Sequence, residues 1–330
     1  MRPPSLKFAE SAASLPKLNL YSMVRLETLL GHGRADIRRV AANAGDYYDP
    51  FYKVDRQRPF QKKFKARKPR RIDNPKGELK VIQRNIYKRI LKRIPLPDNI
   101  LGGVSGATIQ NNALIHIGSK TLAKIDVKSY FPTVTNQHVY IIWRHVLKCS
   151  TEIASLLTQL TTFERHLPQG APTSTILGNL VMCAMDNPIR IASGLNEAEY
   201  SGWVDDLAFS GENPRPIINV AIRELATAGF SVSRRKVKVM GPTSQKILTG
   251  VRLGQTPRAD PKQLARVRSG IHKLRIGAVP PNEVSSYLRS LEGLIAHLAK
   301  LEPKKSGHLA DELHEAIRER EAALRATTPR

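Results

Sequence analysis

The amino-acid sequence predicts an α+β fold, in which a small sheet carrying acidic residues is combined with many helices. Residues 121–126 (TLAKID) form an apolar run that ends in a carboxylate, and residues 200–211 (YSGWVDDLAFSG) place two adjacent aspartates between apolar flanks. Short apolar runs bounded by turn residues are typical of strands. From about residue 261 to the end, the apolar residues have helical spacing instead, and prolines divide this pattern into three segments.

The charge balance indicates a polyanionic partner. The chain has 330 residues, with Lys+Arg 53 against Asp+Glu 28, which gives a formal net charge of +25. A surplus of this size favours nucleic acid as the partner, and an anionic membrane is the alternative. No apolar run approaches the roughly 18 residues that would span a membrane, and no signal peptide is recognisable. With only two cysteines, we expect neither a disulfide framework nor a zinc site, and we expect a cytoplasmic protein without a membrane partner.

Helical spacing predicts further helices through the first two thirds of the chain. We expect them at residues 18–30, 34–44, 79–91 and 109–116, as a pair within 137–163, and at 176–185 and 214–228. The first should stop at Gly31, and Thr173-Ser174 is a suitable N-cap for the helix at 176–185.

Residues 56–93 are strongly basic, and their first half is expected to form a hairpin with strands near 60–65 and 70–73. Guanidinium and ammonium groups at such positions bind triphosphate or backbone phosphate oxygens. Lys65 and Arg70 are the residues that we expect to reach a bound nucleotide. The alternative interpretation is a solvated basic surface.

Residues 101–118 begin with a glycine-rich loop, expected to be flexible, and continue with helical spacing through His116. A single histidine among apolar residues is more often a hydrogen-bonded core residue than a functional one. The residues alone therefore favour a structural role for His116.

The pair Asp205-Asp206 is expected to form the turn of a hairpin between two short strands. Two carboxylates at a buried tip repel each other unless a cation lies between them. Mg²⁺ takes hard oxygen ligands and often shares them with substrate phosphates. The alternative is a solvated surface turn, where aspartate is common.

Asp126 ends a predicted buried strand, and helices separate it from the hairpin, as is normal for neighbouring strands of one sheet. We therefore expect Asp126 to meet Asp205 and Asp206, with the Val127 carbonyl as a further metal ligand. Phe131 follows and is expected either to line the sugar side of a nucleotide pocket or to belong to the core.

Three further segments are candidates for binding roles. The loop at residues 168–172 (PQGAP) permits close backbone approach, and its Gln169 is expected to contact the incoming base or sugar, although a plain connecting loop is the alternative. A lysine in residues 230–239, such as Lys236, could protonate the departing pyrophosphate. The basic helix at 264–276, which carries Arg266 and Lys273, suits a nucleic-acid duplex, although a purely structural subdomain is the alternative.

Taken in order, these segments resemble the bacterial retron-type reverse transcriptases, over about residues 35–300. The resemblance is carried by five motifs: RRIDNPKGELKVIQ, IDVKSYFP, LPQGAPTSTILGNL, WVDDLAF and GFSVSRRK. Each motif is weak by itself, whereas five in the right order are specific. Related enzymes usually have Tyr-Ala before the paired aspartates, where this chain has Trp203-Val204.

Two shorter matches narrow the resemblance to retron enzymes. Residues 112–116 (NALIH) fit an Asn-Ala-x-x-His element, and residues 248–250 (LTG) resemble a Val-Thr-Gly element. In the family both elements are tied to recognition of a structured RNA. The resemblance therefore implies RNA-binding roles for Asn112, His116, Thr249 and Gly250.

The resemblance implies a right-hand polymerase fold with fingers, a catalytic palm sheet and a helical thumb. The expected domains are an N-terminal helical extension at 1–34, fingers at 35–120, palm at 121–254 and thumb at 255–330, with residues 137–185 partly completing the fingers. Two Mg²⁺ ions would be held by Asp126, Val127, Asp205 and Asp206, with Lys65, Arg70, Phe131 and Gln169 around the nucleotide and Lys236 as the proton donor.

The implied activity is RNA-directed DNA polymerisation that starts from an RNA 2′-OH and yields branched multicopy single-stranded DNA (msDNA). The resemblance also implies that the enzyme is part of an anti-phage defence system. Expected partners are the cognate non-coding RNA and its DNA product, dNTPs, a host RNase H and a retron effector protein. The alternatives are an abortive-infection or group II intron-like reverse transcriptase, and an RNA-binding scaffold without catalysis.

Overall fold

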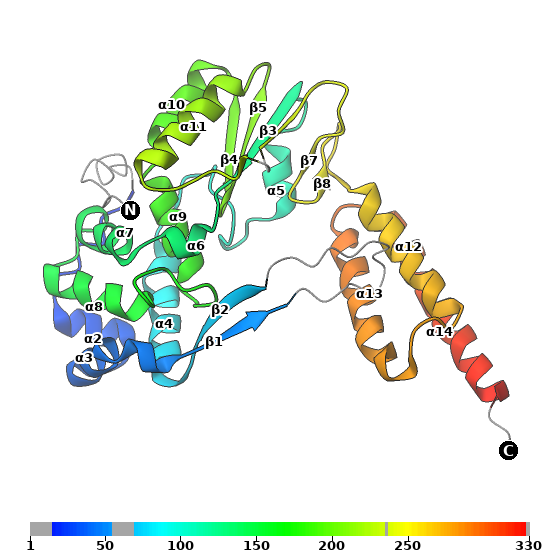
Figure 1. Cartoon of the computed structure of the whole chain (residues 1–330), viewed down its shortest axis with the longest axis horizontal. Coiled ribbons are helices and arrows are strands. Elements are labelled where there is room, and N and C mark those ends of the chain that lie inside the picture. Colours follow the sequence, from blue (N-terminus) through cyan, green and yellow to red (C-terminus); the bar gives the residue numbers. More distant parts are fainter. Residues whose placement is uncertain (1–14, 55–68, 235–236, 328–330) are drawn as a thin grey trace. The chain divides into compact units, whose positions relative to one another are not determined.

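The computed structural model describes residues 15–54, 69–234 and 237–327, with side chains described as far as residue 323. The chain forms two compact units (Figure 1). Unit 1 comprises residues 1–53 and 69–244, and unit 2 comprises residues 54–68 and 245–330. Each unit is described by itself.

Unit 1 contains an antiparallel four-stranded sheet, which combines with helices into the predicted mixture of α and β structure. Its strands, in spatial order, are β4 (Glu199–Trp203), β5 (Asp206–Gly211), β3 (Thr121–Asp126) and β6 (Lys238–Met240). Two amphipathic helices, α10 (Asn187–Leu195) and α11 (Arg215–Thr227), lie beside this sheet, contacting β4 and β3 respectively (Figure 1). The predicted strand at 121–126 is confirmed at both ends.

The remaining helices of unit 1, with the exception of α5, share one hydrophobic core with the sheet. They are α2 (Met23–Leu30), α3 (Arg34–Ala42), η1 (Ala44–Tyr47), α4 (Gly77–Arg89), η2 (Leu91–Arg93), α5 (Ile109–Leu114), α6 (Tyr130–Thr133), α7 (Asn136–Ile141), a π-helical turn at Ile142–Val146, α8 (Thr151–Thr161) and α9 (Ser174–Cys183). The first helix ends, as predicted, with Gly31 in the left-handed conformation. Helix α9 is apolar around its circumference and almost wholly buried, as expected of a core helix.

A separate two-stranded ribbon differs from the prediction. Strand β2 (Arg70–Pro75) forms where a strand was expected, but its partner is β1 (Tyr48–Lys53), in the register Tyr48↔Pro75. The expected partner at 60–65 lies outside the described residues. Five of the six β1 residues are exposed, so the strand has no buried face and leaves no alternating pattern in the sequence.

Unit 2 has its own hydrophobic core, built from three helices. These are α12 (Pro261–Arg275), α13 (Val284–Ala299, preceded by the short helix η5 at Pro281–Glu283) and α14 (Pro303–Thr327). They follow a small sheet of β7 (Ile247–Leu248), β8 (Val251–Arg252) and β9 (Arg258–Ala259). The three predicted helical segments are confirmed. Helix α14 begins at Pro303 itself, because proline is well tolerated in the first helical turn.

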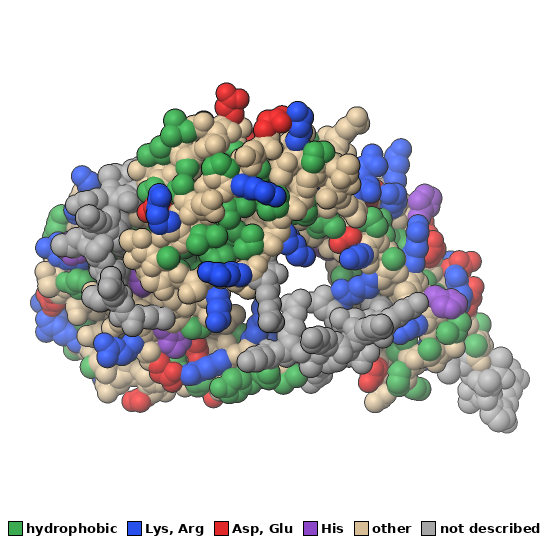
Figure 2. All heavy atoms as spheres, turned by 45° about the horizontal axis from the view of Figure 1, so that its top comes forward, with side chains coloured by type: hydrophobic (Ala, Val, Ile, Leu, Met, Phe, Trp, Pro, Cys, Tyr) green, Lys and Arg blue, Asp and Glu red, His purple; other side chains and the backbone are tan. Residues whose placement is uncertain are grey.

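In the part of the chain that the structure describes, no helix combines the length and the hydropathy needed to cross a membrane. Lysine and arginine side chains are exposed at many positions in both units (Figure 2).

Candidate active site

The acidic hairpin is formed by β4 and β5, but its turn lies one residue earlier than predicted. Trp203 pairs with Asp206, so the two turn residues are Val204 and Asp205, and Asp206 begins β5. Val204 has φ of +60°, which is unfavourable for a β-branched residue. Two-residue hairpins favour such turns with positive φ because they match the twist of the strands. The sequence did not indicate this strained position.

Strand β3 pairs with β5 and brings the third aspartate to the hairpin. Asp126 lies directly opposite Asp206, and the Val127 N–H donates to the Asp205 carbonyl oxygen at 3.0 Å. Residues directly opposite in an antiparallel pair project from the same face, with Cβ atoms about 5 Å apart. The expected pairing of the two acidic segments is therefore confirmed at the level of the backbone. Asp206 is exposed, whereas Asp126 and Asp205 are half-buried.

The donor atoms suit a hard divalent cation, but their arrangement does not form a complete metal site. Among the described residues, no group of three or more His, Cys, Asp or Glu side chains is placed to hold a metal ion. Lys124, which lies two residues before Asp126 on the same face of β3, contributes a cation here. Burial lowers the pKa of this lysine, and attraction to the Asp206 carboxylate opposes that shift. Lys124 was not among the residues predicted from the sequence, although the spacing Lys-x-Asp on one strand indicates that the two side chains share a face.

The glycine-rich loop supports the hairpin closely and is not loosely attached, contrary to the expectation of flexibility. The Leu101 N–H donates to the Gly202 carbonyl oxygen at 2.9 Å. A Cβ added at Gly102 would lie 2.4 Å from the Val204 nitrogen, so no side chain fits there. The Asn179 side-chain amide of α9 donates to the Gly102 carbonyl oxygen at 2.8 Å. The loop is therefore fixed between the hairpin tip and a buried helix.

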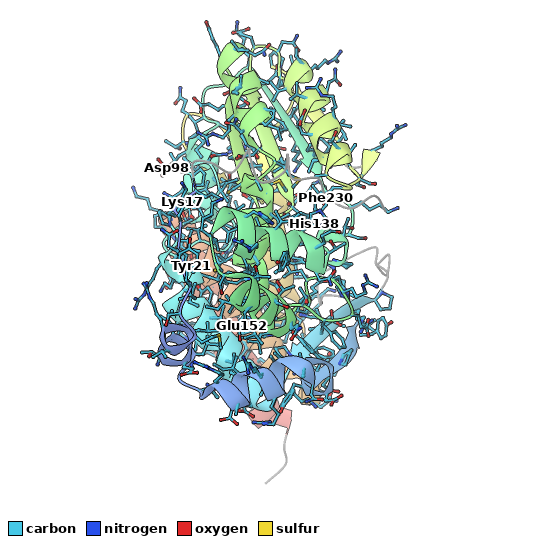
Figure 3. The ribbon with its side chains drawn as sticks, turned by 90° about the vertical axis from the view of Figure 1, so that its left-hand side faces the viewer. Lys17, Tyr21, Asp98, His138, Glu152 and Phe230 are labelled. Atoms are coloured by element: carbon cyan, nitrogen blue, oxygen red, sulfur yellow. The ribbon has the colours of Figure 1, made fainter. Side chains whose placement is uncertain are left out.

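The segment that precedes Lys236 also lies beside β3. The Lys128 N–H donates to the Ser231 carbonyl oxygen at 2.7 Å, and the Ser233 N–H donates to the Asp126 carbonyl oxygen at 2.9 Å. Phe230 anchors this segment against the His138 ring of α7, with ring centroids 5.2 Å apart (Figure 3). Lys236 itself lies outside the described residues.

The predicted nucleotide-binding residues differ in their exposure to solvent, and one of them lies outside the described residues. Arg70 is exposed at the start of β2, and Lys65 lies outside the described residues. Phe131 is half-buried, with part of its ring packed on the core beside Tyr130. Gln169 is half-buried, and its backbone is bonded to Asp73 of β2. The structure therefore places Gln169 beside the strand that carries Arg70.

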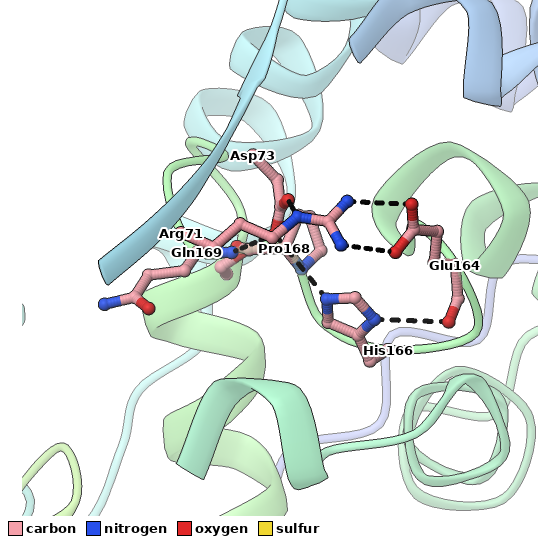
Figure 4. Close-up of polar contacts among 7 residues, drawn as sticks. Arg71, Asp73, Glu164, His166, Pro168 and Gln169 are labelled. Carbon is pink, nitrogen blue, oxygen red and sulfur yellow. Dashed lines mark hydrogen bonds and ion pairs between the residues drawn. The ribbon is translucent and has the colours of Figure 1, made fainter. Parts of the chain in front are cut away.

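A group of charged residues that the sequence did not indicate surrounds this contact. We call Arg71, Asp73, Glu164 and His166 the Arg71 cluster (Figure 4). Arg71 binds both carboxylate oxygens of Glu164 at 2.7 Å, and its Nε lies 2.8 Å from Asp73 Oδ1. The cluster links β2 to the loop that leads into Gln169.

Comparison with known proteins identifies the family. The family described as reverse transcriptase (RNA-dependent DNA polymerase) matches residues 60–253, which is more than half of the chain. The chain belongs to the reverse transcriptase family. It is accordingly an RNA-directed DNA polymerase, in agreement with the acidic residues brought together by β3 and the hairpin.

Curated relatives of this reverse transcriptase are retron enzymes, which confirms the resemblance found in its motifs. The chain is 28% identical to the retron Ec86 reverse transcriptase of Escherichia coli, over 81% of the chain and 85% of that relative. It is also 28% identical to the retron Mx65 and retron Mx162 reverse transcriptases of Myxococcus xanthus. Those matches cover 73% and 72% of the chain, but only 60% and 56% of the two relatives.

Two of the predicted RNA-binding residues of the reverse transcriptase lie in its interior. We call Asn112, His116, Ser201 and Ser210 the His116 network, and each of them is at most 1% exposed. His116 Nδ1 lies 2.7 Å from Ser210 Oγ, and its Nε2 lies 2.7 Å from Ser201 Oγ. Both side chains are buried, as the core-histidine interpretation expects, and a role of Asn112 and His116 in RNA recognition stays a prediction.

The electrostatics of the His116 network follow from its burial. Burial lowers the pKa of His116 to about 4, so the ring is neutral at neutral pH. The Ser201 hydroxyl donates to Asn112 Oδ1 at 2.7 Å, so its oxygen accepts from the His116 Nε2–H. Nδ1 is then an acceptor for the Ser210 hydroxyl. The ring thereby joins α5 to both strands of the acidic hairpin.

The other predicted RNA-binding residues lie in unit 2. Thr249 and Gly250, with φ of +47° and +82°, form the two-residue turn between β7 and β8. The φ of Gly250 favours glycine in this turn, whereas the Gln263 Nε2 that lies 2.8 Å from an added Cβ is the movable end of a side chain of α12. Arg266 and Lys273 are half-buried and lie seven residues apart, about two turns, along α12. Their contact with RNA stays a prediction.

Proposed function

We propose that this reverse transcriptase is the polymerase of a retron. It copies part of a structured non-coding RNA into branched msDNA, starting from an RNA 2′-OH, and serves in anti-phage defence together with an effector protein. The observation that supports polymerase chemistry most directly is the register of Asp126 opposite Asp206, beside Asp205. The similarity to retron enzymes over most of the chain supports the retron assignment.

In this proposal the fold is a right hand. The four-stranded sheet with the acidic hairpin serves as the palm, the β1–β2 ribbon and the helices near it serve as fingers, and the three helices of unit 2 serve as the thumb. The proposed limits are 1–34 for the N-terminal extension, 35–120 for the fingers, 121–254 for the palm and 255–330 for the thumb, with 137–185 partly in the fingers.

Asp126, Asp205, Asp206 and the Val127 carbonyl would hold two Mg²⁺ ions, because all four offer hard oxygen ligands. Bound Mg²⁺ would lower the pKa of the attacking hydroxyl and stabilise the charge on pyrophosphate. Before binding, Lys124 compensates part of the negative charge of the hairpin. Such phosphoryl transfer depends mainly on positioning and on charge neutralisation.

The residues around the hairpin would bind and orient the nucleotide. Arg70 and Lys65 hold the triphosphate, Gln169 contacts the base or sugar, and Phe131 excludes a ribose 2′-OH by its bulk. Lys236 protonates the departing pyrophosphate. These roles would favour dNTPs as substrates, and removal of the copied RNA would require a host RNase H.

The structured RNA would be bound through the basic face of α12 and through the two family elements. Arg266 and Lys273 meet the phosphate backbone, and the Thr249-Gly250 turn contacts the RNA. Asn112 and His116 would act from the interior, by fixing α5 so that its outer surface is presented to the RNA.

The test is to express the gene together with its flanking DNA and to extract the nucleic acid. The expected product is single-stranded DNA attached to RNA, whose mobility changes after RNase treatment and after enzymatic debranching. The double variant Asp205→Asn, Asp206→Asn should yield none of it. Unbranched DNA copied from an added primed RNA would favour the abortive-infection or group II-like alternative. Equal product from the double variant would favour the scaffold.

A further inference from the structure

We propose that Asp73 is a positioning residue: it holds residues 168–170, the Gln169 loop, against β2 and thereby sets the fit of the incoming nucleotide. This inference rests on the proposed roles of Gln169 and Arg70. It assigns a function to the Arg71 cluster, which neither the motifs nor the family match explains.

Asp73 binds the Gln169 loop through two hydrogen bonds that run in opposite directions. The Asp73 N–H donates to the Gln169 carbonyl oxygen at 2.9 Å, and the Gln169 N–H donates to Asp73 Oδ2 at 3.3 Å. Gly170 lies equally close, because a Cβ added there would be 3.2 Å from the Asp73 carbonyl oxygen and 2.9 Å from Ile72 Cγ2. The backbone of the loop is therefore held at the distance of a neighbouring strand.

The charge of Asp73 is compensated within the Arg71 cluster. Asp73 is 2% exposed, and a carboxylate buried to this extent is costly without a cation beside it. Arg71 provides that cation at 2.8 Å, and His166 Nε2 lies 3.5 Å from Asp73 Oδ2. The Arg71 side chain also packs over the Phe163 ring at 5.6 Å. The cluster thus places cationic and imidazole nitrogens beside the Asp73 carboxylate and leaves its Oδ2 directed toward the Gln169 N–H.

The turn that leads into the loop is strained and is held by the same arginine. Glu164 and Arg165 have φ of +47° and +64°, in the region that non-glycine residues rarely adopt. Backbone of this kind persists only where surrounding contacts over-determine it, and such positions gather at functional sites. The bidentate pair of Arg71 with Glu164 is one such contact, and its hydrogen bonds lower the pKa of Glu164.

The entry of the loop is also fixed to the core of unit 1. The Ser174 hydroxyl, at the start of α9, donates to the Pro168 carbonyl oxygen at 2.6 Å, and the Leu167 N–H donates to the Val134 carbonyl oxygen at 2.8 Å. With Pro168 at the entry of the loop held in place, the separation between β2 and Gln169 depends on Asp73. A change of that separation would move Gln169 relative to Arg70, the two residues that we place around the nucleotide.

The inference is tested by steady-state kinetics of the full-length enzyme on oligo(dT)-primed poly(rA), with dTTP varied. Asp73→Ala is expected to raise the KM for dTTP roughly tenfold with kcat within about twofold. A misplacement of about 1 Å can cost about a hundredfold, and the loss of one of two hydrogen bonds should displace the loop by less than that. Asp73→Asn keeps an acceptor for the Gln169 N–H and should restore most of the parental KM. Glu164→Gln, at a half-exposed position, perturbs the same loop and should raise KM by a smaller factor.

Glu78→Gln is the matched control. It removes a different ion pair of unit 1, in which Arg39 Nη2 lies 2.8 Å from Glu78 Oε2, without touching the Gln169 loop. Its KM for dTTP should equal that of the parent. If Asp73→Ala lowers kcat in proportion to a loss of folded protein and leaves KM unchanged, Asp73 is merely structural and the inference is overturned.

Amide hydrogen exchange separates this inference from the proposed function. The Gln169 N–H should exchange faster in Asp73→Ala than in the parent and in Glu78→Gln, whether or not the preparation polymerises. Faster exchange with no polymerisation by the parent would refute the proposed function and keep the positioning of the loop. Unchanged exchange and unchanged KM in an active enzyme would refute the inference alone.

Discussion

The Arg71 cluster and the His116 network are both four-residue polar groups of unit 1, but they hold their segments by different physical means. In the Arg71 cluster, ion pairs join a strand to a loop, and the Glu164 side chain is half exposed. In the His116 network, neutral hydrogen bonds join a helix to two strands, and every member is buried.

This difference determines how each group responds to substitution. A half-exposed ion pair is partly replaced by water and by salt, so its loss costs little free energy of unfolding. A buried hydroxyl or imidazole that loses its partner pays the full cost of desolvation. We therefore expect the Arg71 cluster to tune the contact between β2 and the Gln169 loop at little cost in stability. The His116 network instead fixes one arrangement of α5 and the acidic hairpin.

The largest effect is expected from His116→Leu. This change removes the acceptor of the buried Ser210 hydroxyl and the donor to Ser201 Oγ, while Ser201 keeps its bond to Asn112. The loss of these two buried hydrogen bonds should cost about 3 kcal/mol together. The free energy of unfolding, measured by urea denaturation, should fall by that amount. Ser119→Ala is the control, because Ser119 is half-buried and donates to Ser210 from the margin of the network. Equal losses in the two variants would contradict the comparison.

The second prediction concerns pH. Burial lowers the pKa of His116 from 6.5 to about 4, so between these values the unfolded chain binds more protons than the folded one. Stability should therefore fall as pH is lowered from about 6.5 to 4, by about 3 kcal/mol in total from this residue. The quantity to measure is the difference in free energy of unfolding between the parent and His116→Gln across this range.

The two proteins are compared because Asp186 changes the free energy of unfolding with pH in the opposite direction. Burial raises the pKa of Asp186 from 3.8 to about 6, so its contribution weakens stability as pH rises through the same range. Both proteins share this contribution, and it cancels in the difference. A difference that does not change with pH would mean that the imidazole is not held neutral by its surroundings.

The smallest effect on stability is expected from Glu164→Gln. The variant loses the charged pair with Arg71, and a pair of this exposure contributes less than about 1 kcal/mol. The loss should shrink further in 1 M NaCl, because salt screens exposed charges. Denaturation curves at low and high salt test this, and a loss as large as that of His116→Leu would remove the distinction between the two groups.

How much the sequence predicts depends on whether a residue leaves a periodic signal. The apolar run at residues 121–126 predicted both ends of β3, and the helical spacing of apolar residues predicted the helices of unit 2. Strand β1 was missed because its faces are exposed. The hairpin turn was placed one residue late, because only the backbone geometry reveals a strained Val204.

The acidic residues of the candidate site could be predicted from the sequence, whereas the residues that hold its loops in place could not. The Arg71–Glu164 contact joins residues 93 positions apart, which no local pattern records. The Asn-Ala-x-x-His spacing drew attention to Asn112 and His116, but it could not show that both side chains lie in the interior. Lys65 and Lys236 lie outside the described residues, and their roles stay predictions.

Helix α9 is hydrogen-bonded both to the Gln169 loop and to the glycine-rich loop beside the acidic hairpin, so it sets the distance between these two attachment points. Its first residue, Ser174, binds the Gln169 loop, and Asn179 binds the glycine that presses on the hairpin tip. Five residues of α-helix advance about 7.5 Å, a length that a buried helix cannot readily stretch. Helix α9 therefore fixes the distance between the Gln169 loop and the tip of the acidic hairpin. A residue inserted between Ser174 and Asn179 would rotate and shift one of these contacts relative to the other.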